Sequence, residues 1–134
     1  MKSLRIFVDA NVLFSACNAG SPTSRTFRTA VGSHDVFTCA LAIDETARNL
    51  ARKKPAWLVE LRYLQPLLQL LPLGVAPAGF ELPKIDGMLL GAAIDAHCDI
   101  FLTGDKHHFG HLFDQVINGV CVLKPAKFAE QHPD

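Results

Sequence analysis

The stretch RIFVDANVLFSA, residues 5–16, decides the fold class. It opens on a nearly continuous apolar run, and such a run, rich in branched and aromatic side chains, is typical of a central parallel strand covered on both faces. The run ends at Asp9, after which apolar residues recur at helical spacing. The stretch IFLTGDKHH, residues 100–108, repeats this arrangement with Asp105. A carboxylate at the end of two strands that both read as buried needs an explanation.

Strand and helix patterns alternate along the rest of the chain. We expect five strands, over residues 5–8, 35–39, 71–75, 100–102 and 120–123. We expect helices after Asp9, from Ser21-Pro22 onward, over residues 41–54, 57–71 (kinked or divided at Pro66) and 86–97, and after Pro125. This alternation predicts an α/β fold with a mostly parallel sheet. Because the chain shows no internal repeat and no linker, residues 1–134 are expected to form a single domain.

The composition excludes several classes of protein. Hydrophobic residues make up 49% of the chain, which is typical of a globular protein and not of a disordered one. The 13 basic residues balance the 13 acidic ones, which argues against a protein that coats nucleic acid by bulk charge but allows a local basic groove. The four cysteines form no CxxC pair, and prolines interrupt the apolar segment 64–80. We therefore expect a reduced, cytoplasmic protein with no signal peptide and no membrane span.

Four acidic residues are expected to meet at one edge of the sheet. In an open parallel sheet, ligands bind beyond the carboxyl ends of the strands, where the strand order reverses. Asp9 and Asp105 follow two strands directly, Asp86 opens the helix before the second of these strands, and Glu45 lies early in the helix after residues 35–39. Clustered carboxylates repel one another, whereas a divalent cation favours their ionised form. Oxygen ligands of this kind suit Mg²⁺ or Mn²⁺.

Each of these acids also has an ordinary structural interpretation. An aspartate after a strand is often a turn former or a helix cap, and Asp86 could simply interact with a helix dipole. Glu45 competes with its neighbour Asp44, and helical geometry alone does not choose between them. Asp95 is simpler, because nine residues beyond Asp86 it points about 180° away on a helix, and we expect it to be exposed.

The stretch HHFGH, residues 107–111, carries a second pattern. His107 and His111 are one helical turn apart, which is the spacing of a two-histidine zinc pair. No third soft ligand accompanies them, and the neighbouring aspartates favour a harder ion. We therefore expect these two histidines to lie on the surface or to contact substrate.

Several segments together resemble one known family, the PIN-domain ribonucleases. RIFVDANVLFSA resembles the opening strand of that family, with Asp9 and Asn11 in its D-x-N pattern. IDETARNL resembles its acidic helix, with Glu45 five positions before Leu50. DGMLLGAAIDAHCDIFLTGDKHHFG resembles its most diagnostic region, in which an aspartate opens an alanine-rich helix and a strand then leads to T-G-D. The closing segment KPAKF, residues 124–128, is also similar, so the resemblance covers essentially the whole chain.

The resemblance implies both a fold and an activity. The expected fold is a three-layer PIN-like domain with a mostly parallel five-stranded sheet flanked by helices. The implied activity is hydrolysis of phosphodiester bonds in single-stranded RNA by a Mg²⁺- or Mn²⁺-dependent endoribonuclease. The residues that would hold one or two ions, directly or through water, are Asp9, Glu45, Asp86 and Asp105.

The resemblance also implies partners. Many small members, of the VapC type, are toxins that a separate antitoxin inhibits, so we expect a cognate antitoxin. Small PIN proteins commonly pair, and the leucine-rich residues 57–71 are the expected surface of a homodimer. Two alternatives stay open, which are a housekeeping RNA-processing nuclease and a PIN module that binds RNA or protein without cutting.

Further polar residues could support the acids. Asn11 and Thr103 have short side chains placed to orient a carboxylate or a water molecule, although either could equally cap a turn. Arg48 shares one side of its helix with Glu45, and Lys106 follows Asp105. Both are candidates for contacts to substrate phosphates, and a solvated helix face is the ordinary alternative.

Overall fold

A mostly parallel sheet forms the centre of the molecule. The computed structural model describes residues 3–133. Its strands are β1 (Arg5–Val8), β2 (Asp35–Cys39), β3 (Gln69–Leu71), β4 (Ile100–Leu102), β5 (Val116–Ile117) and β6 (Val120–Leu123). The strand order is β3-β2-β1-β4-β6-β5, and every neighbouring pair is parallel except the antiparallel pair of β5 and β6. The prediction of a mostly parallel sheet is confirmed.

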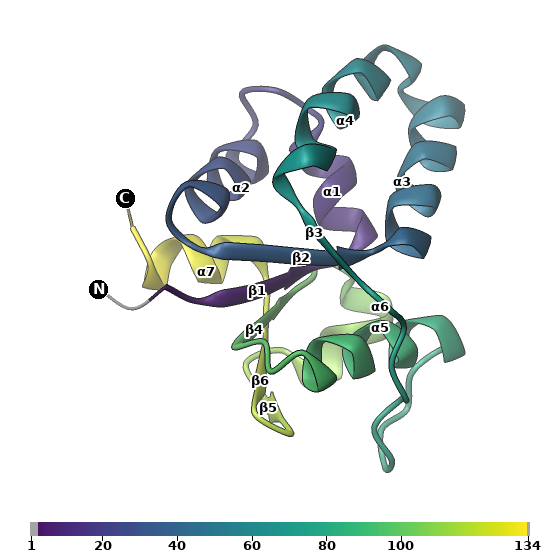
Figure 1. The fold of residues 1–134 in the computed structure, drawn as a ribbon, viewed down its shortest axis with the longest axis vertical. Helices are drawn as coiled ribbons and strands as arrows, with labels where there is room; N and C mark the ends of the chain where they lie inside the picture. Colours follow the sequence, from purple (N-terminus) through teal and green to yellow (C-terminus); the bar gives the residue numbers. More distant parts are fainter. Residues whose placement is uncertain (1–2, 134) are drawn as a thin grey trace.

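Helices cover both faces of this sheet (Figure 1). They are α1 (Ala10–Ala16), α2 (Pro22–Ser33), α3 (Ala40–Lys53), α4 (Leu58–Leu64), α5 (Lys84–Asp95), α6 (Lys106–Phe109) and α7 (Pro125–Gln131). Short 3-10 turns lie at Pro55–Trp57, Gln65–Leu67 and Gly110–Leu112. Helices α1 to α4 and α7 contribute side chains to one core, and α5 and α6 contribute to the other. The three-layer PIN-like architecture predicted from the sequence is confirmed.

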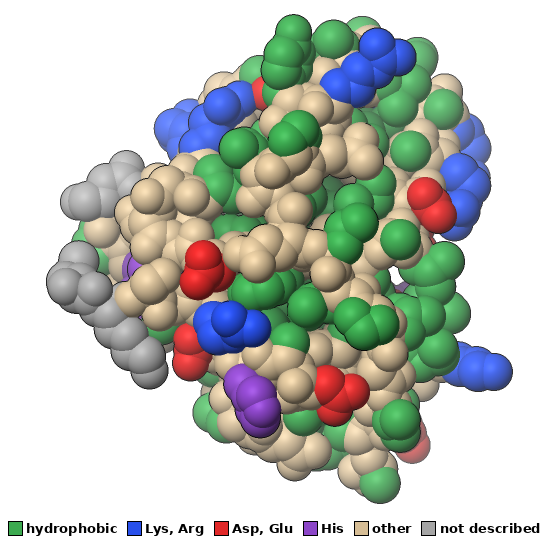
Figure 2. Space-filling view, viewed as in Figure 1, with side chains coloured by type: hydrophobic (Ala, Val, Ile, Leu, Met, Phe, Trp, Pro, Cys, Tyr) green, Lys and Arg blue, Asp and Glu red, His purple; other side chains and the backbone are tan. Residues whose placement is uncertain are grey.

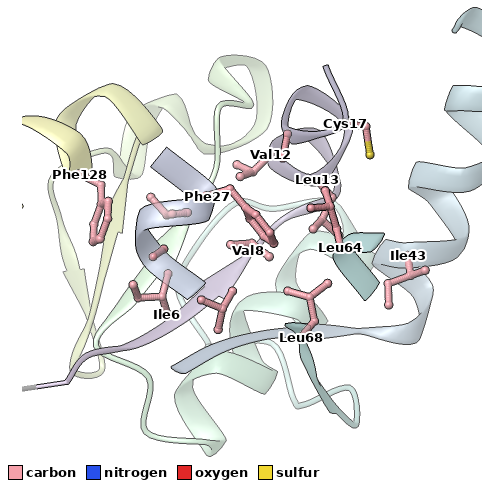
Figure 3. Close-up of a cluster of buried hydrophobic side chains, with 14 of the residues drawn as sticks. Ile6, Val8, Val12, Leu13, Cys17, Phe27, Ile43, Leu64, Leu68 and Phe128 are labelled. Carbon is pink, nitrogen blue, oxygen red and sulfur yellow. The ribbon is translucent and has the colours of Figure 1, made fainter. Parts of the chain in front are cut away.

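The two cores explain why the central strands are apolar throughout. Successive side chains of a strand point to opposite faces. In β1, Ile6 and Val8 therefore enter the core beneath α1 and α2, where Figure 3 shows them near Phe27, whereas Phe7 enters the opposite core. On that opposite face Phe7 stacks on Phe101 of β4, with ring centroids 5.2 Å apart. Each central strand thus needs apolar residues at every position.

The strand order reverses beside β1. From β1 the chain passes to β2 and β3 on one side, and then returns to β4 on the other side of β1. Val8 of β1 pairs with Leu102 of β4, so the two strands end at the same level. The backbone N–H of Asp9 still donates to the carbonyl of Leu102 at 3.0 Å. The carboxyl ends of β1 and β4 therefore flank the position where parallel sheets of this kind bind ligands.

The sheet has one strand more than the sequence predicted. The additional strand, β5, is only two residues long and forms a hairpin with β6 through Asn118 and Gly119. Both turn residues have positive φ, 47° and 92°, as a tight hairpin with an Asn-Gly turn requires. The predicted total of five strands was therefore one short, because a two-residue strand leaves almost no alternating pattern to detect.

The middle of the chain departs most from expectation. The helix predicted over residues 57–71 is limited to α4, which is flanked by 3-10 turns at Pro55–Trp57 and Gln65–Leu67. The strand predicted over residues 71–75 instead occupies Gln69–Leu71 and ends before Pro72. Proline lacks the N–H that a strand needs for its ladder, which accounts for this end.

The segment after β3 runs directly against α5. The N–H of Gly74 donates to the carbonyl of Met88 at 3.1 Å. A Cβ atom at Gly74 would lie 2.3 Å from the carbonyl carbon of Gly91, and a Cβ at Gly91 would lie 2.2 Å from the carbonyl oxygen of Val75. Only two glycines allow the two backbones to approach this closely, and the contact fixes the helix that begins near Asp86.

The remaining expectations on compartment concern cysteines and membrane spans. All four cysteines are free thiols, and Cys17, Cys39 and Cys98 are buried. Within residues 3–133, no helix combines the length and apolarity needed to cross a membrane.

Candidate metal centre

Asp9 lies at the carboxyl end of β1 as the N-cap of α1, and it is only 4% exposed. Its Oδ1 accepts a hydrogen bond from the backbone N–H of Ala10 at 2.8 Å. Its Oδ2 accepts two, from the Asn11 amide at 2.9 Å and from the Thr103 hydroxyl at 2.8 Å. The chain therefore holds this carboxylate in one orientation, with three donors around it.

Burial makes the ionised form of Asp9 costly. Removal from water raises its pKa from 3.8 to about 6, and the negative charges of Asp86 and Glu45 act in the same direction. The hydrogen bonds from Thr103 and Ala10 oppose this rise because they favour the carboxylate. A nearby divalent cation would favour the ionised form much more strongly.

Asn11 and Thr103 connect the ends of β1 and β4. Thr103 is fully buried, and its hydroxyl accepts a hydrogen bond from the backbone N–H of Asp105 at 3.1 Å while it donates to Asp9. The Asn11 amide oxygen accepts from the N–H of Gly104 at 2.7 Å. The two side chains therefore fix the Thr103-Gly104-Asp105 turn against Asp9.

Asp105 and Asp86 both contact the same histidine, His108. Asp105 is the N-cap of α6, and its Oδ1 accepts from the backbone N–H of His108 at 3.0 Å. Its Oδ2 lies 2.8 Å from Nδ1 of His108, and Oδ2 of Asp86 lies 3.1 Å from the same nitrogen. Burial is the main cause that raises the pKa of Asp86; the charges of Asp105 and Glu45 add to the rise, and His108 opposes it.

Glu45 reaches the same site from α3. The hydroxyl of the adjacent residue, Thr46, is buried between two carbonyl oxygens, 2.8 Å from that of Ala42 in its own helix and 3.3 Å from that of Ala10 at the start of α1. A cleft of about 520 Å³ opens at this edge of the sheet, lined by Asp9, Asn11, Leu41, Glu45, Arg48, Pro83, Ile85, Asp86, Asp105 and His108. Glu45 thus lines the cleft and Asp44 does not, which is a distinction the sequence left open.

The structure separates several other residues from this cleft. Lys106 is exposed on α6 and is absent from the lining of the cleft. His107 and His111 line a neighbouring cleft of about 530 Å³, together with Phe80, Glu81, Leu82, Pro83 and His108. Asp95 is exposed at the other end of α5, as predicted.

His108 is the site residue that the sequence analysis missed. Its ring nitrogen and the carboxylate oxygens of Asp86 and Asp105 all lie within 4.8 Å of one another. A signal was present in the sequence, since the N-cap residue and the residue three positions later face each other at the start of a helix. The pattern D-x-x-H therefore predicts a contact between Asp105 and His108 once Asp105 is recognised as a cap.

The residues present fit a divalent cation. Four carboxylates line the cleft around one imidazole, and two of these carboxylates have a raised pKa because they are buried or close to like charges. Within residues 3–133, every buried polar side-chain atom has a hydrogen-bond partner. Oxygen-rich donor sets of this kind bind Mg²⁺ and Mn²⁺.

Comparisons with known proteins agree with this architecture. The fold matches the crystal structure of VapBC2 from Rickettsia felis bound to a DNA fragment from their promoter, with a TM-score of 0.65 and 11% sequence identity. That match covers 90% of this chain and 98% of the other. A search of curated proteins found no match. The family model of the PIN domain matches residues 6–112. This chain belongs to the PIN domain family.

Proposed function

We propose that this protein is a divalent-metal-dependent endoribonuclease that hydrolyses phosphodiester bonds of single-stranded RNA. The observation that carries the proposal is the single cleft at the β1–β4 switch point, which is lined by Asp9, Glu45, Asp86 and Asp105. Membership of the PIN domain family supports nuclease chemistry at this position. The proposed cofactor is Mg²⁺ or Mn²⁺, which when bound would lower the pKa of water and neutralise charge on the phosphate.

The side chains of the cleft would have different roles in cleavage. Asp105 uses Oδ1 to cap α6, which leaves Oδ2 for a cation. Asp9 accepts two hydrogen bonds at Oδ2 and one at Oδ1, so Oδ1 keeps the freer lone pair. Asn11 and Thr103 hold Asp9 in place, and Arg48 lines the cleft, where its guanidinium could contact a phosphate through two donors.

The charge distribution favours a modest affinity for RNA that depends on salt. The chain carries equal numbers of acidic and basic residues, and basic and acidic side chains are interspersed with apolar ones on the face drawn in Figure 2. Each phosphate contact adds to the salt dependence of binding. We therefore propose that a few contacts within the cleft, and not bulk attraction, select the RNA.

We further propose that residues 1–134 act as one PIN domain, the toxin of a toxin–antitoxin pair in the cytoplasm. Its likeness in fold to VapBC2, over 98% of the matched chain, supports a partner of the antitoxin type. The free cysteines are consistent with a reducing compartment. Inducible expression in a bacterial host tests the proposal, because a toxin should arrest growth and Asp86→Asn should not.

A homodimer through residues 57–71, which include α4, the turn Gln65–Leu67 and β3, is part of the proposal. Four apolar side chains on this surface are exposed by roughly half or more: Val59, Tyr63, Leu67 and Leu70, at 55, 69, 48 and 59%. Sedimentation velocity of the wild type should show a dimer, and Leu67→Glu should shift it to a monomer. A wild type that stays monomeric at high concentration would remove the dimer from the proposal.

The decisive experiment is cleavage of a mixed-sequence single-stranded RNA with Mg²⁺, with Mn²⁺ and with a chelator. Asp86→Asn should abolish cleavage, whereas Asp95→Asn, which removes a carboxylate from the exposed end of the same helix, should leave it intact. Cleavage without growth arrest would favour a housekeeping nuclease. RNA binding without cleavage under any metal would favour a non-cleaving module.

A further inference from the structure

The imidazole of His108 bridges two carboxylates of the cleft, and the cap of α6 does not depend on it. The backbone N–H of His108 donates to the Asp105 carboxylate and completes the cap of α6, whatever side chain follows. The side chain is 40% exposed, so it contributes little to the core. Its ring nitrogen Nδ1 instead points at the two carboxylates of the cleft, Asp86 and Asp105.

The two distances from the His108 nitrogen match the edges of a coordination shell. Octahedral ligands at about 2.1 Å from a small divalent ion lie about 3.0 Å from their neighbours. Nδ1 of His108 lies 2.8 Å from Oδ2 of Asp105 and 3.1 Å from Oδ2 of Asp86. Two of the three ligand–ligand distances therefore fit such a shell, and the two carboxylate oxygens lie within 4.8 Å of each other.

We propose that His108 is a nitrogen ligand of the divalent cation, beside Asp86 and Asp105, and that it makes the cleft select a transition ion such as Mn²⁺ over Mg²⁺. This inference rests on the proposed function of the cleft and narrows its cofactor. Mg²⁺ takes oxygen ligands, whereas imidazole nitrogen binds first-row transition ions. The expectation of a purely oxygen-ligated ion, drawn from the acids alone, did not include this nitrogen.

A different role for His108 has different consequences. If the imidazole only bridges the two carboxylates by hydrogen bonds, it competes with the cation for the same oxygens. Its removal would then tighten the binding of Mg²⁺ and Mn²⁺ alike, or leave both unchanged. If the imidazole is a ligand, in contrast, its removal lowers the affinity for the transition ion selectively. The two roles are therefore separable by metal binding alone, without any measurement of RNA cleavage.

The experiment compares His108→Asn with His107→Asn in the full chain. Asparagine keeps a polar atom near the position of Nδ1 and retains the backbone cap, so the fold is expected to persist. His107 is the adjacent imidazole, and it lines the neighbouring cleft, not the acidic one. Calorimetric titrations with MnCl₂ and MgCl₂ give the two affinities, and spin-echo modulation of bound Mn²⁺ reports any directly coordinated ¹⁴N.

In the wild type and in His107→Asn, Mn²⁺ should bind at least about tenfold more tightly than Mg²⁺, with a ¹⁴N coupling. In His108→Asn the ratio should approach one, and the ¹⁴N coupling should disappear. Mn²⁺ bound to the wild type without ¹⁴N coupling, or an unchanged ratio in His108→Asn, would overturn the role of His108 and leave the oxygen site standing. A wild type that binds neither ion would instead refute the metal dependence in the proposed function itself.

Discussion

The ends of β1 and β4 lie side by side, yet they hold their aspartates in opposite ways. Asp9 is 4% exposed and accepts hydrogen bonds from Ala10, Asn11 and Thr103. Asp105 is partly exposed, caps α6 and shares His108 with Asp86. The first aspartate is a fixed anchor in the protein interior, and the second belongs to a group of side chains that solvent can reach.

For the proposed cation site, this difference would place a buried ligand beside ligands that solvent can reach. The buried anchor fixes one ligand and accepts an energetic cost, since burial raises the pKa of Asp9. In the proposed cation site, Asp86 and Asp105 would supply ligands that solvent can reach. The predictions below compare the two ends of the cleft, beginning with an effect that both ends are expected to share.

The largest expected effect is a loss of catalysis, and we expect it for the aspartates at the ends of both β1 and β4. Asp9→Asn and Asp105→Asn should each reduce kcat for RNA cleavage by roughly 10³-fold, because each removes several kcal/mol of charge stabilisation at the cation. Asn is as good a helix cap as Asp, so neither variant should unfold. Single-turnover cleavage assays at saturating Mn²⁺ measure the effect. A variant at Asp9 that retains most activity would make that residue purely structural.

The next effect should appear only at the buried end. Because the pKa of Asp9 is raised from 3.8 to about 6 in the folded state, this group stabilises the protein below pH 4 relative to neutral pH. That contribution is lost as the pH rises through about 6. We subtract the free energy of unfolding of the wild type from that of Asp9→Asn, both measured with a chelator present. This difference should increase by about 2–3 kcal/mol between pH 4 and pH 7.

Urea unfolding at the two pH values measures this gain. Asp95→Asn is the matched control, since it removes one negative charge from an exposed position. Parallel pH profiles for the wild type and Asp9→Asn would show that Asp9 is not buried as a costly anion in solution.

A smaller effect should arise at the hydroxyl that joins the two ends. Thr103→Val keeps the shape but removes the donor to Asp9 and the acceptor for the N–H of Asp105. We expect it to cost about 2 kcal/mol of stability and to raise the pKa of Asp9 further, because that hydrogen bond lowers it. Cleavage should fall by about 10–100-fold.

Thr103→Ser retains the hydroxyl and is expected to restore most of the activity. Thermal unfolding and cleavage rates of the two variants provide the comparison. A loss in Thr103→Ser that Thr103→Val does not share would assign the role of Thr103 to its methyl group and to packing.

The smallest expected effect distinguishes two neighbouring acids of α3. Glu45 lines the cleft and Asp44 does not, although both are exposed. Glu45→Gln should weaken Mn²⁺ binding by a few-fold, because it removes a carboxylate that reaches the cation from the rim, whereas Asp44→Asn should leave binding unchanged. Calorimetric titration of both variants gives the answer, and equal effects would mean that only net charge matters.

Much of the candidate site was predictable from the sequence, because a single property of parallel sheets relates its residues. Apolar runs that end on Asp9 and Asp105 read as parallel strands, and such strands bring their ends together. The choice between Glu45 and Asp44 was beyond sequence reasoning, because it depends on how Thr46 fixes α3 against α1. His108 was missed because a zinc pattern drew attention to the histidines on either side of it.

The middle of the chain was the least predictable part for a physical reason. Residues 57–75 are rich in leucine and proline, and the prolines divide the leucines into runs too short for a helical period to be recognised. The structure uses a helix, a strand and 3-10 turns, in α4, β3 and the turns around them. The local sequence pattern therefore predicts that this segment is apolar, but not where its helix, strand and turns begin and end.

Because of the close approach of Gly74 and Gly91, these two distant positions of the sequence cannot be changed independently. A methyl group at either glycine would meet backbone atoms of the other segment at 2.2–2.3 Å, and backbone cannot yield as a side chain can. Replacing residues 72–76 by the equivalent segment of another protein of this fold would therefore succeed only if the new segment keeps a glycine at position 74. This segment and α5 therefore have to be exchanged together, as one unit.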